Sequence, residues 1–508
     1  MLFTRWPGLS RDQKQSEVKL APILCLAFYC QWIGTEISLA DIYIIYGRQD
    51  EGRTEELVKL LSQRWIVWWD RLVKQRFVDD IHKELPATRC ALVLWSETSR
   101  TKDTVIDEVR LAQEHEVPII CASLDGSGPA YGFGGYATTD LSSWEGQEDH
   151  AAFSRLFDRL TAILPPTKRA KRPADIANGR LPLPSVFLSV SSFETQLVPH
   201  GAVKALALAR APTLLVSAWD LVKRRKPDAL INALNEYKDT GGFILLDSGN
   251  YEASRLTAKR WTRSDFEEVL GAVPFDWAFC FDKTKTRLPS KPSRLADNII
   301  ENARRDQALT DAPVMPVIHV PRLNSGGYKA EMIPKVTRLV AEALHPPMIG
   351  IPERELGAGV SQRVATMREV RRELDQLSFY QPIHLLGTGN PWTVGILASA
   401  GADCFDGLEW CRTVVDHETD RLNHFQHFDL FTDQTRFADL AIASQALDDP
   451  DVDFAGKVAF HNIDYFMRFN VRLREMARED RLESFVTSRL GKAATEMLLR
   501  LNPEVFKA

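Results

Sequence analysis

The sequence predicts an α/β protein made of two successive α/β domains and a helical tail, and three observations support this fold class. The chain has 508 residues, and at roughly 100–200 residues per domain this length favours several domains over one. Its 44% hydrophobic and 26% charged residues are the proportions of a globular protein. From Asp41 onward, short apolar runs alternate with amphipathic segments of helical spacing, which is typical of parallel sheets covered by helices.

Charge and cysteine content narrow the class of protein. The net charge of −5 shows no overall basic excess of the kind that marks a nucleic-acid-binding protein. The seven cysteines never occur in C-x-x-C spacing, which fits a reducing cytoplasm and gives no disulfide scaffold or zinc ribbon. We therefore expect a cytoplasmic protein.

Residues 1–40 are expected to be an N-terminal extension. The apolar run LAPILCLAFYCQWIG is shorter than the ~20 residues that a membrane-spanning helix needs. We expect no stable membrane insertion, and partial membrane attachment remains the alternative.

The first α/β domain is predicted over residues 41–164. Its strands are expected at DIYIIY, WIVWW, CALVLW and PIICASL, and its helices at EELVKLLSQR, Phe77–Leu85, Thr104–His115 and Ala151–Leu164. Strands and helices that alternate at this length build a doubly wound parallel sheet. Residues 165–183, rich in proline and basic residues, are expected to form a linker.

The second α/β domain is predicted over residues 184–431 as a (β/α)₈ barrel of the TIM type. Eight strand-like runs occur there: SVFLSV, TLLVSAW, GFILLD, WAFCF, VMPVIHV, PPMIGI, PIHLLG and CFDGLEW. In such a barrel the residues that end the strands converge at one face, where chemistry takes place. The strand ends supply Asp220, Asp247, Asp282, His319, Glu353, Gly387, Gly389 and Asp406. Residues 432–508 are expected to form an α-helical tail.

The first domain resembles a known family. DIYIIYGRQD, WIVWWDRLVKQRFVDDIHKEL, CALVLWSETS, TVIDEVRLA and VPIICASLDG are similar, in order and spacing, to bacterial TIR (Toll/interleukin-1 receptor) domains. The resemblance implies a flavodoxin-like fold, self-association, and cleavage of NAD⁺ as a substrate by one glutamate of the third helix, here Glu108. Arg48 and Asp50 lie just past the first strand, at the usual ligand edge of an open parallel sheet. Together with Trp68, Trp69 and Ser96 they are the candidate cofactor-binding residues.

The residue types suit this chemistry. Cleavage of the nicotinamide–ribose bond passes through an oxocarbenium-like ribose, which one nearby carboxylate can stabilise. The flat rings of Trp68 and Trp69 offer faces on which a base can stack. Two positions depart from the family pattern: Gly47 replaces a serine that many relatives carry, and Thr104 replaces a tryptophan.

The second domain resembles the tRNA-guanine transglycosylases (queuine tRNA-ribosyltransferases) in LLDSGNYEAS, WAFCFDKT, PPMIGIPERELGAG and PIHLLGTGNPWTVGILASAGADCFDGLEW. The resemblance implies that Asp247 acts as acid and base, that Asp282 reads the edge of guanine and that Asp406 attacks the ribose. It places the base near Ser248, Gly249, His319, Gly350 and Gly389.

The same region departs from that family at its metal site. The family's C-x-C-x₂-C run is absent, and His417, His424 and His427 lack the thiolates that a closed structural zinc site needs. We expect no structural zinc. Asn250 stands where the family has a glycine, so the barrel is also compatible with binding a purine without exchanging it.

Three hypotheses follow. In the first, the protein is an NAD⁺ hydrolase effector of anti-phage defence, controlled by a barrel that senses a nucleobase, a nucleoside or a nucleic acid. In the second, the barrel exchanges bases in tRNA or DNA and the TIR domain is an assembly scaffold. In the third, both domains are interaction modules without turnover.

Overall fold

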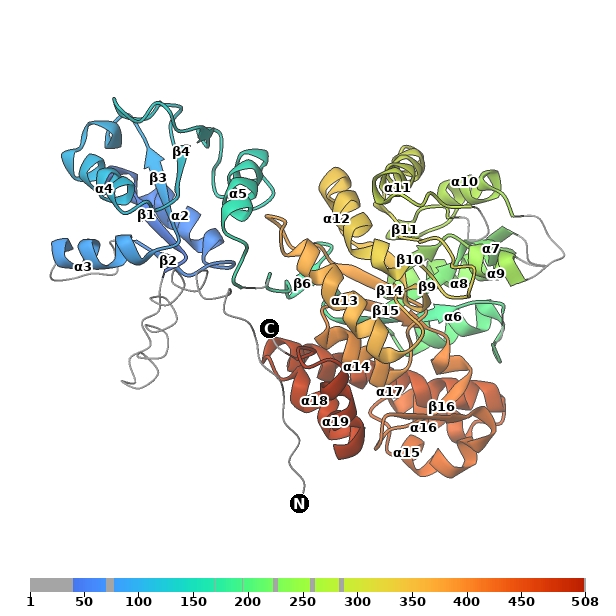
Figure 1. Cartoon of the computed structure of the whole chain (residues 1–508). Coiled ribbons are helices and arrows are strands. Elements are labelled where there is room, and N and C mark those ends of the chain that lie inside the picture. Colours follow the sequence, from blue (N-terminus) through green and yellow to red (C-terminus); the bar gives the residue numbers. More distant parts are fainter. Residues whose placement is uncertain are drawn as a thin grey trace, which may run out of the picture. The chain divides into compact units, whose positions relative to one another are not determined.

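The computed structural model describes residues 40–69, 77–168, 170–193, 195–222, 227–255, 261–282 and 287–506. The chain divides into two compact units between Thr167 and Lys168 (Figure 1). Except for Ala40, the predicted N-terminal extension lies outside the described residues. No helix of the described residues is long and apolar enough to cross a bilayer.

The first unit contains a five-stranded parallel sheet. Its strands are β1 (Ile42–Ile45), β2 (Val67–Trp68), β3 (Cys90–Trp95), β4 (Ile119–Ser123) and β5 (Thr138–Asp140). They lie in the order β2-β1-β3-β4-β5, and every pairing is parallel. This is the order of a flavodoxin-like doubly wound sheet, as the sequence predicts. The short strand β5 was not predicted.

Helices cover both faces of this sheet because apolar residues occupy consecutive strand positions. Along β1, Ile42 and Ile44 pack with the apolar residues of α2 (Glu51–Leu61) and α5 (Ala151–Ile163). Tyr43 and Ile45 point to the other face and pack with α3 (Phe77–Glu84) and α4 (Asp103–Glu114). Successive side chains of a strand alternate between faces, so a fully apolar strand requires cover on both sides.

The second unit contains eight parallel strands, arranged as a nearly closed barrel. They are β8 (Ser185–Val190), β9 (Thr213–Ser217), β10 (Phe243–Asp247), β11 (Trp277–Phe279), β12 (Val314–Met315), β13 (Ile349–Pro352), β14 (Ile383–Leu386) and β15 (Cys404–Gly407). The ladder runs β12-β11-β10-β9-β8-β15-β14-β13. A parallel bridge between Val317 and Gly350 connects its two ends. The fold class is therefore the one that the sequence predicts.

Nine helices of the described residues follow the barrel strands (Figure 1). They are α6 (Pro199–Leu208), α7 (Ala218–Val222), α8 (Pro227–Asp239), α9 (Asn250–Arg255), α10 (Arg263–Ala272), α11 (Pro292–Gln307), α12 (Ile333–Leu344), α13 (Val360–Leu374) and α14 (Pro391–Ser399). Outward residues such as Leu214 and Ile244 pack against them, whereas Leu215 and Leu245 fill the barrel interior. The same alternation turns Asp247 and Asp406 inward, since they follow the inward residues Leu245 and Cys404 by two positions.

A hairpin that the sequence analysis did not predict lies between the last barrel strand and the helical tail. After β15, β16 (Thr413–Asp416) pairs with β17 (Arg421–His424) in antiparallel register. The helices α15 (Thr432–Arg436), α16 (Ala441–Asp448), α17 (Phe454–Arg478), α18 (Leu482–Leu490) and α19 (Lys492–Leu501) complete the unit. Asn462 of α17 donates to the carbonyls of Trp410 and Thr413 and accepts from the amide of Val415, so the long helix is fixed to the hairpin.

The residues predicted as a linker include a short hairpin, with β6 (Asp175–Ile176) antiparallel to β7 (Leu181–Pro182). Leu181 and Leu183 are buried in the apolar cluster of the barrel interior. Arg172 forms an ion pair of 2.7 Å with the fully buried carboxylate of Asp403. Asp403 also accepts hydrogen bonds from Arg371 at 3.2 Å and Tyr380 at 2.6 Å.

We expect Asp403→Ala to destabilise the second unit by about 3–5 kcal/mol, because it leaves buried guanidinium groups without their counter-charge. The loss is measured by urea-dependent hydrogen exchange of peptides from β14, whose Ile383 amide donates to Asp403. The matched control is Glu369→Ala, which removes an exposed partner of Arg372 and should cost less than about 1 kcal/mol. Equal effects of the two substitutions would contradict the structural role of Asp403.

Candidate functional site

Two of the predicted cofactor-binding residues meet at the carboxyl edge of the first sheet. Ser96 follows β3 and donates a hydrogen bond of 2.7 Å to Asp50, which follows β1. Burial raises the pKa of Asp50, and the hydrogen bond from Ser96 opposes this shift. Arg48 lies two residues before Asp50 and is exposed. Ligands of open α/β sheets bind at this edge, so Asp50 and Ser96 are placed to contact one.

Glu108 lies on α4 and is half-buried. The hydroxyl of Tyr43 donates to it at a long distance of 3.4 Å. The ring of Tyr43 in turn stacks on Trp68, with 4.4 Å between centroids. Trp69 packs in the apolar cluster on the opposite face of the sheet. Of the two predicted tryptophans, it is therefore Trp68 that lies on the side of Glu108. The adjoining residues 70–76 lie outside the described residues.

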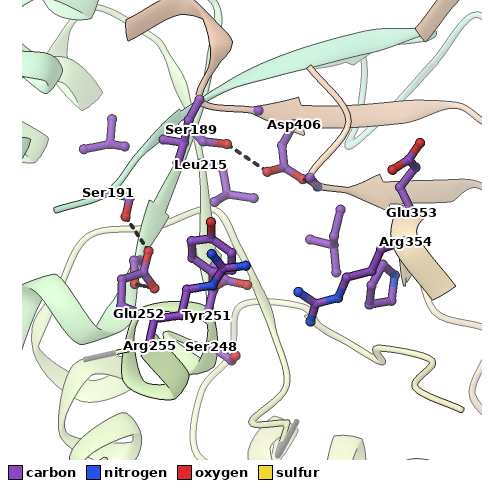
Figure 2. A pocket seen from close by; sticks show the side chains of 18 of the residues that line it. Ser189, Ser191, Leu215, Ser248, Tyr251, Glu252, Arg255, Glu353, Arg354 and Asp406 are labelled. Atoms are coloured by element: carbon purple, nitrogen blue, oxygen red, sulfur yellow. Dashed lines mark hydrogen bonds between the residues drawn. The ribbon is translucent and has the colours of Figure 1, made fainter. Parts of the chain in front are cut away.

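The second candidate site is a cavity of about 300 Å³ at the carboxyl ends of the barrel strands (Figure 2). It is large enough for a small ligand. Asp247, Asp282 and Asp406, predicted to converge, all line it, together with Ser248 and His319. The remaining lining residues are Ser189, Val190, Ser191, Leu215, Ser217, Tyr251, Glu252, Arg255, Pro352, Glu353, Arg354, Leu386, Gly387, Gly407, Leu408, Glu409 and Arg412.

Asp406 is held in one orientation by three hydrogen bonds. Ser189 donates to one carboxyl oxygen at 2.8 Å (Figure 2). The Nε2 atom of His384 and the amide of Gly387 contact the other oxygen at 2.9 and 3.0 Å. The imidazole of His384 is fully buried and lies near the rings of Phe187 and Phe279. A carboxylate fixed in this way is ordered before a ligand arrives, as a nucleophile or an electrostatic stabiliser requires.

Asp247 differs from Asp406 in that its surroundings disfavour the charged form of its carboxyl group. Burial, followed by the charges of Glu252 and Asp282, raises its pKa well above the ordinary value of a carboxyl. Its hydrogen bond from the amide of Gly249, at 3.0 Å, only partly offsets this. A carboxyl that keeps its proton near neutral pH can donate it to a leaving group or to an acceptor of a bound ligand.

Asp282 is part of a buried ionic chain with His319 and Glu355. The imidazole of His319 contacts Asp282 at 2.6 Å and Glu355 at 2.7 Å through its two nitrogens. Burial lowers the pKa of His319, but hydrogen bonds to both carboxylates raise it to about 10 overall. Burial likewise opposes the ionisation of Asp282, yet the contact with His319 lowers its pKa. Ser248 and Asn250 also donate to Asp282, so the departure at Asn250 supports this carboxylate.

The three predicted glycines have structural roles. Gly249 adopts a φ of +80°, and a Cβ atom there would come within 2.5 Å of the backbone nitrogen of Trp219. Gly350 lies against the ring of Phe279, and a side chain at Gly389 would overlap the carboxyl of Glu409. None of the three is among the residues that line the cavity. The expectation that Gly350 and Gly389 let the backbone approach a flat ligand is thus replaced by close packing within the protein.

The sequence analysis did not predict that α9 supplies three residues, Tyr251, Glu252 and Arg255, to the lining of the cavity. Glu252 is buried and accepts hydrogen bonds from Ser191 at 2.5 Å and Ser217 at 2.6 Å. Burial, with the nearby charge of Asp220, raises the pKa of Glu252 to about 7. Tyr251 and Arg255 stand four positions apart on the same helix, and the guanidinium lies 4.4 Å from the ring centroid. The spacing of Tyr251 and Arg255, directly after the DSGN run, could have indicated that the two side chains lie on one face of a helix beside the site.

His417, one of the three histidines considered for a zinc site, lies in a network of hydrogen bonds with His461. The rings of His417 and His461 stack at 4.1 Å, and each contacts a backbone carbonyl. Burial lowers the pKa of His417 to about 3 and that of His461 to about 4. Within the described part of the chain, no group of side chains has the arrangement of a metal site.

Residues 42–157 match the family model of the TIR domain. This match covers most of the first unit, so the chain contains a TIR domain, followed by an eight-stranded parallel barrel and C-terminal helices. No curated protein matches the sequence. The resemblance of the barrel to transglycosylases rests on the sequence motifs alone.

We expect His319→Gln to remove a pH-dependent part of the stability of the second unit. The pKa of His319 is raised from about 6.5 in the unfolded chain to about 10 in the folded protein. Its stabilising contribution is therefore complete below pH 6.5 and is lost as the pH rises through about 10. Calorimetric unfolding of the full chain should show the largest difference between wild type and variant near pH 6.

The control for this experiment is His427→Gln, because His427 is exposed. It should follow the wild type across the whole pH range. A constant difference between wild type and His319→Gln at every pH would contradict a charged imidazole in the folded state.

Proposed function

We propose that the TIR domain is an NAD⁺ hydrolase and that the barrel binds a nucleobase-containing ligand which controls it. The observation that carries the first half is the half-buried Glu108 on α4, within hydrogen-bonding range of Tyr43 in a sequence that matches the TIR family. TIR domains often hydrolyse NAD⁺ and commonly self-associate, and anti-phage defence is the setting in which a cofactor-depleting enzyme serves the cell.

The chemistry needs one carboxylate beside the ribose. As nicotinamide departs as a neutral base, positive charge develops on the ribose, and Glu108 would stabilise it and orient the ribose hydroxyls. Tyr43 restrains the carboxylate, and Trp68, stacked on Tyr43, provides an aromatic surface on the same side of the sheet. Asp50 and Ser96 at the carboxyl edge would contact the rest of the dinucleotide.

The proposal that the barrel binds a nucleobase is supported by carboxyl groups that differ in protonation and in hydrogen bonding. Protonated Asp247 would donate a hydrogen bond, while Asp282 and Asp406 would accept them. A nucleobase presents donors and acceptors on one flat edge, which such a set can match. A ligand held there would control the TIR domains only if it binds their assembled state more tightly than the separate state.

We expect Glu108→Gln to reduce nicotinamide release at least about 100-fold, since the loss of one key electrostatic group in an active site has effects of this size. The assay uses the full chain at high concentration, with phage extract added. The matched control is Asp107→Asn, an exposed neighbour on α4 that forms an ion pair with the exposed Arg110. Activity that survives in Glu108→Gln, or disappears equally in Asp107→Asn, would refute the role of Glu108.

A second candidate function is base exchange in the barrel, with the TIR domain as an assembly scaffold. The pairing of a protonated Asp247 with an ordered Asp406 favours it, because displacement of a base needs a proton donor and a nucleophile. Asp406 would attack C1′ of the ribose as the bond from C1′ to the base breaks, and Asp247 would protonate the departing base. The incoming base would then displace Asp406 from C1′ and give up its proton to Asp247.

This candidate predicts incorporation of radiolabelled guanine into tRNA or DNA, and its loss in Asp406→Asn. That substitution keeps the size of the side chain but removes the nucleophile. Absence of incorporation over a panel of tRNA and DNA substrates, with the wild type shown to be folded, would exclude base exchange and leave binding as the role of the pocket.

A further inference from the structure

A second cavity adjoins the carboxyl-lined pocket of the barrel. It has a volume of about 710 Å³ and shares His319 and Arg354 with the first. The loop that follows His319 forms much of its wall, through Pro321, Arg322, Leu323, Asn324, Tyr328 and Lys329. Arg287 and Leu288 lie on another part of the wall. Because two residues are common to both linings, the cavities lie next to each other, and a ligand that reaches past the side chains of His319 and Arg354 would contact both.

The two cavities differ in charge. The first is lined by six carboxyl groups, of Asp247, Glu252, Asp282, Glu353, Asp406 and Glu409, and by the guanidinium groups of Arg255, Arg354 and Arg412. The second is lined by His319, by four arginine and lysine side chains, of Arg287, Arg322, Lys329 and Arg354, and by the single carboxyl group of Glu355. Glu355 is buried, and its two oxygens already accept from His319 and from the amide of Val320. The second cavity therefore has an excess of positive charge that its own lining does not neutralise.

The four cations are available to a ligand. Among the residues that the structure describes, none of the four forms an ion pair with a carboxylate, and the guanidinium of Arg322 contacts only the ring of Tyr328, at 5.4 Å. Arg287, Arg322 and Arg354 are exposed, and Lys329 is half-buried. Figure 2 shows Arg354 extending into the first pocket toward Tyr251 and Arg255. Arginine and lysine side chains left unpaired around a concave surface are the usual means of holding phosphate.

We propose that the barrel binds a phosphorylated nucleoside, with its base and ribose in the carboxyl-lined pocket and its phosphate in the basic cavity. The proposal rests on the nucleobase-binding role proposed for the barrel and adds the chemical class of the ligand. The first pocket suits groups that donate hydrogen bonds, such as base N–H and ribose hydroxyls. One oxygen of Glu409 is buried there without a hydrogen-bond partner among the described residues. A phosphate would be attracted more strongly by the neighbouring cavity, where cationic side chains outnumber carboxyl groups.

The test compares each of the four common nucleoside 5′-monophosphates with its own nucleoside, by calorimetric titration of the full chain. We expect at least one nucleotide to bind about tenfold or more tightly than its nucleoside, the effect of one or two charge-assisted contacts. Arg322→Gln combined with Lys329→Gln changes only the second cavity, so it should abolish this preference and leave nucleoside affinity unaltered. Arg372→Gln, on the exposed surface of α13, should keep the preference.

The outcomes separate this inference from the function on which it rests. If nucleosides bind as tightly as their nucleotides, the phosphate site is refuted while the base pocket stands. If neither class binds, both are refuted. A 5′-phosphorylated single-stranded oligonucleotide identifies the source of the phosphate. Tighter binding than the mononucleotide, with a steep dependence on salt, supports a nucleic-acid ligand, and equal binding supports a free nucleotide.

Discussion

The protonated imidazole of His319, held between Asp282 and Glu355, is the interaction on which the barrel site depends. Parallel strands of a barrel bring their carboxyl ends to one face, and here that face collects six carboxyl groups around one small cavity. Such crowding raises the pKa of some of them and would leave others to repel one another. A cation with both nitrogens engaged, at 2.6 and 2.7 Å, orients the carboxyl groups of Asp282 and Glu355 and lowers the pKa of Asp282.

The remaining carboxyl groups divide according to their surroundings. Asp247 and Glu252 have raised pKa values because they are buried close to other carboxylates. Asp406 accepts three hydrogen bonds and is oriented by a buried histidine. A proton donor, an ordered acceptor and an ion-paired acceptor thus line one cavity. This set of one donor and two acceptors suits both the recognition of a base and the cleavage of its bond to ribose. Turnover experiments distinguish the two.

The sequence predicts most of this fold because each barrel strand is a short apolar run bounded by polar residues. Asp247, Asp282 and Asp406 could be placed at one face since each follows such a run. The position of Glu252 in the cavity could not be predicted in the same way, because it depends on hydrogen bonds from Ser191 and Ser217, which lie at the ends of two other strands. The hairpin of β16 and β17 was missed because its exposed polar strand, RLNH, lacks an apolar run. The packing of Gly389 on Glu409 is also a long-range contact that local sequence does not encode.

If the TIR domain cleaves NAD⁺ as proposed, its activity must be controlled, since a constantly active enzyme would deplete the cofactor of the cell. Assembly of TIR domains provides that control if the pocket near Glu108 is complete only between subunits. The most direct test is the specific rate of nicotinamide release as a function of protein concentration, with and without the nucleotide that binds the barrel most tightly. Our account predicts a rate per molecule that rises with concentration, and a ligand that shifts this rise to lower concentration. A rate per molecule that is the same at every concentration, in a sample shown to be monomeric, would contradict it.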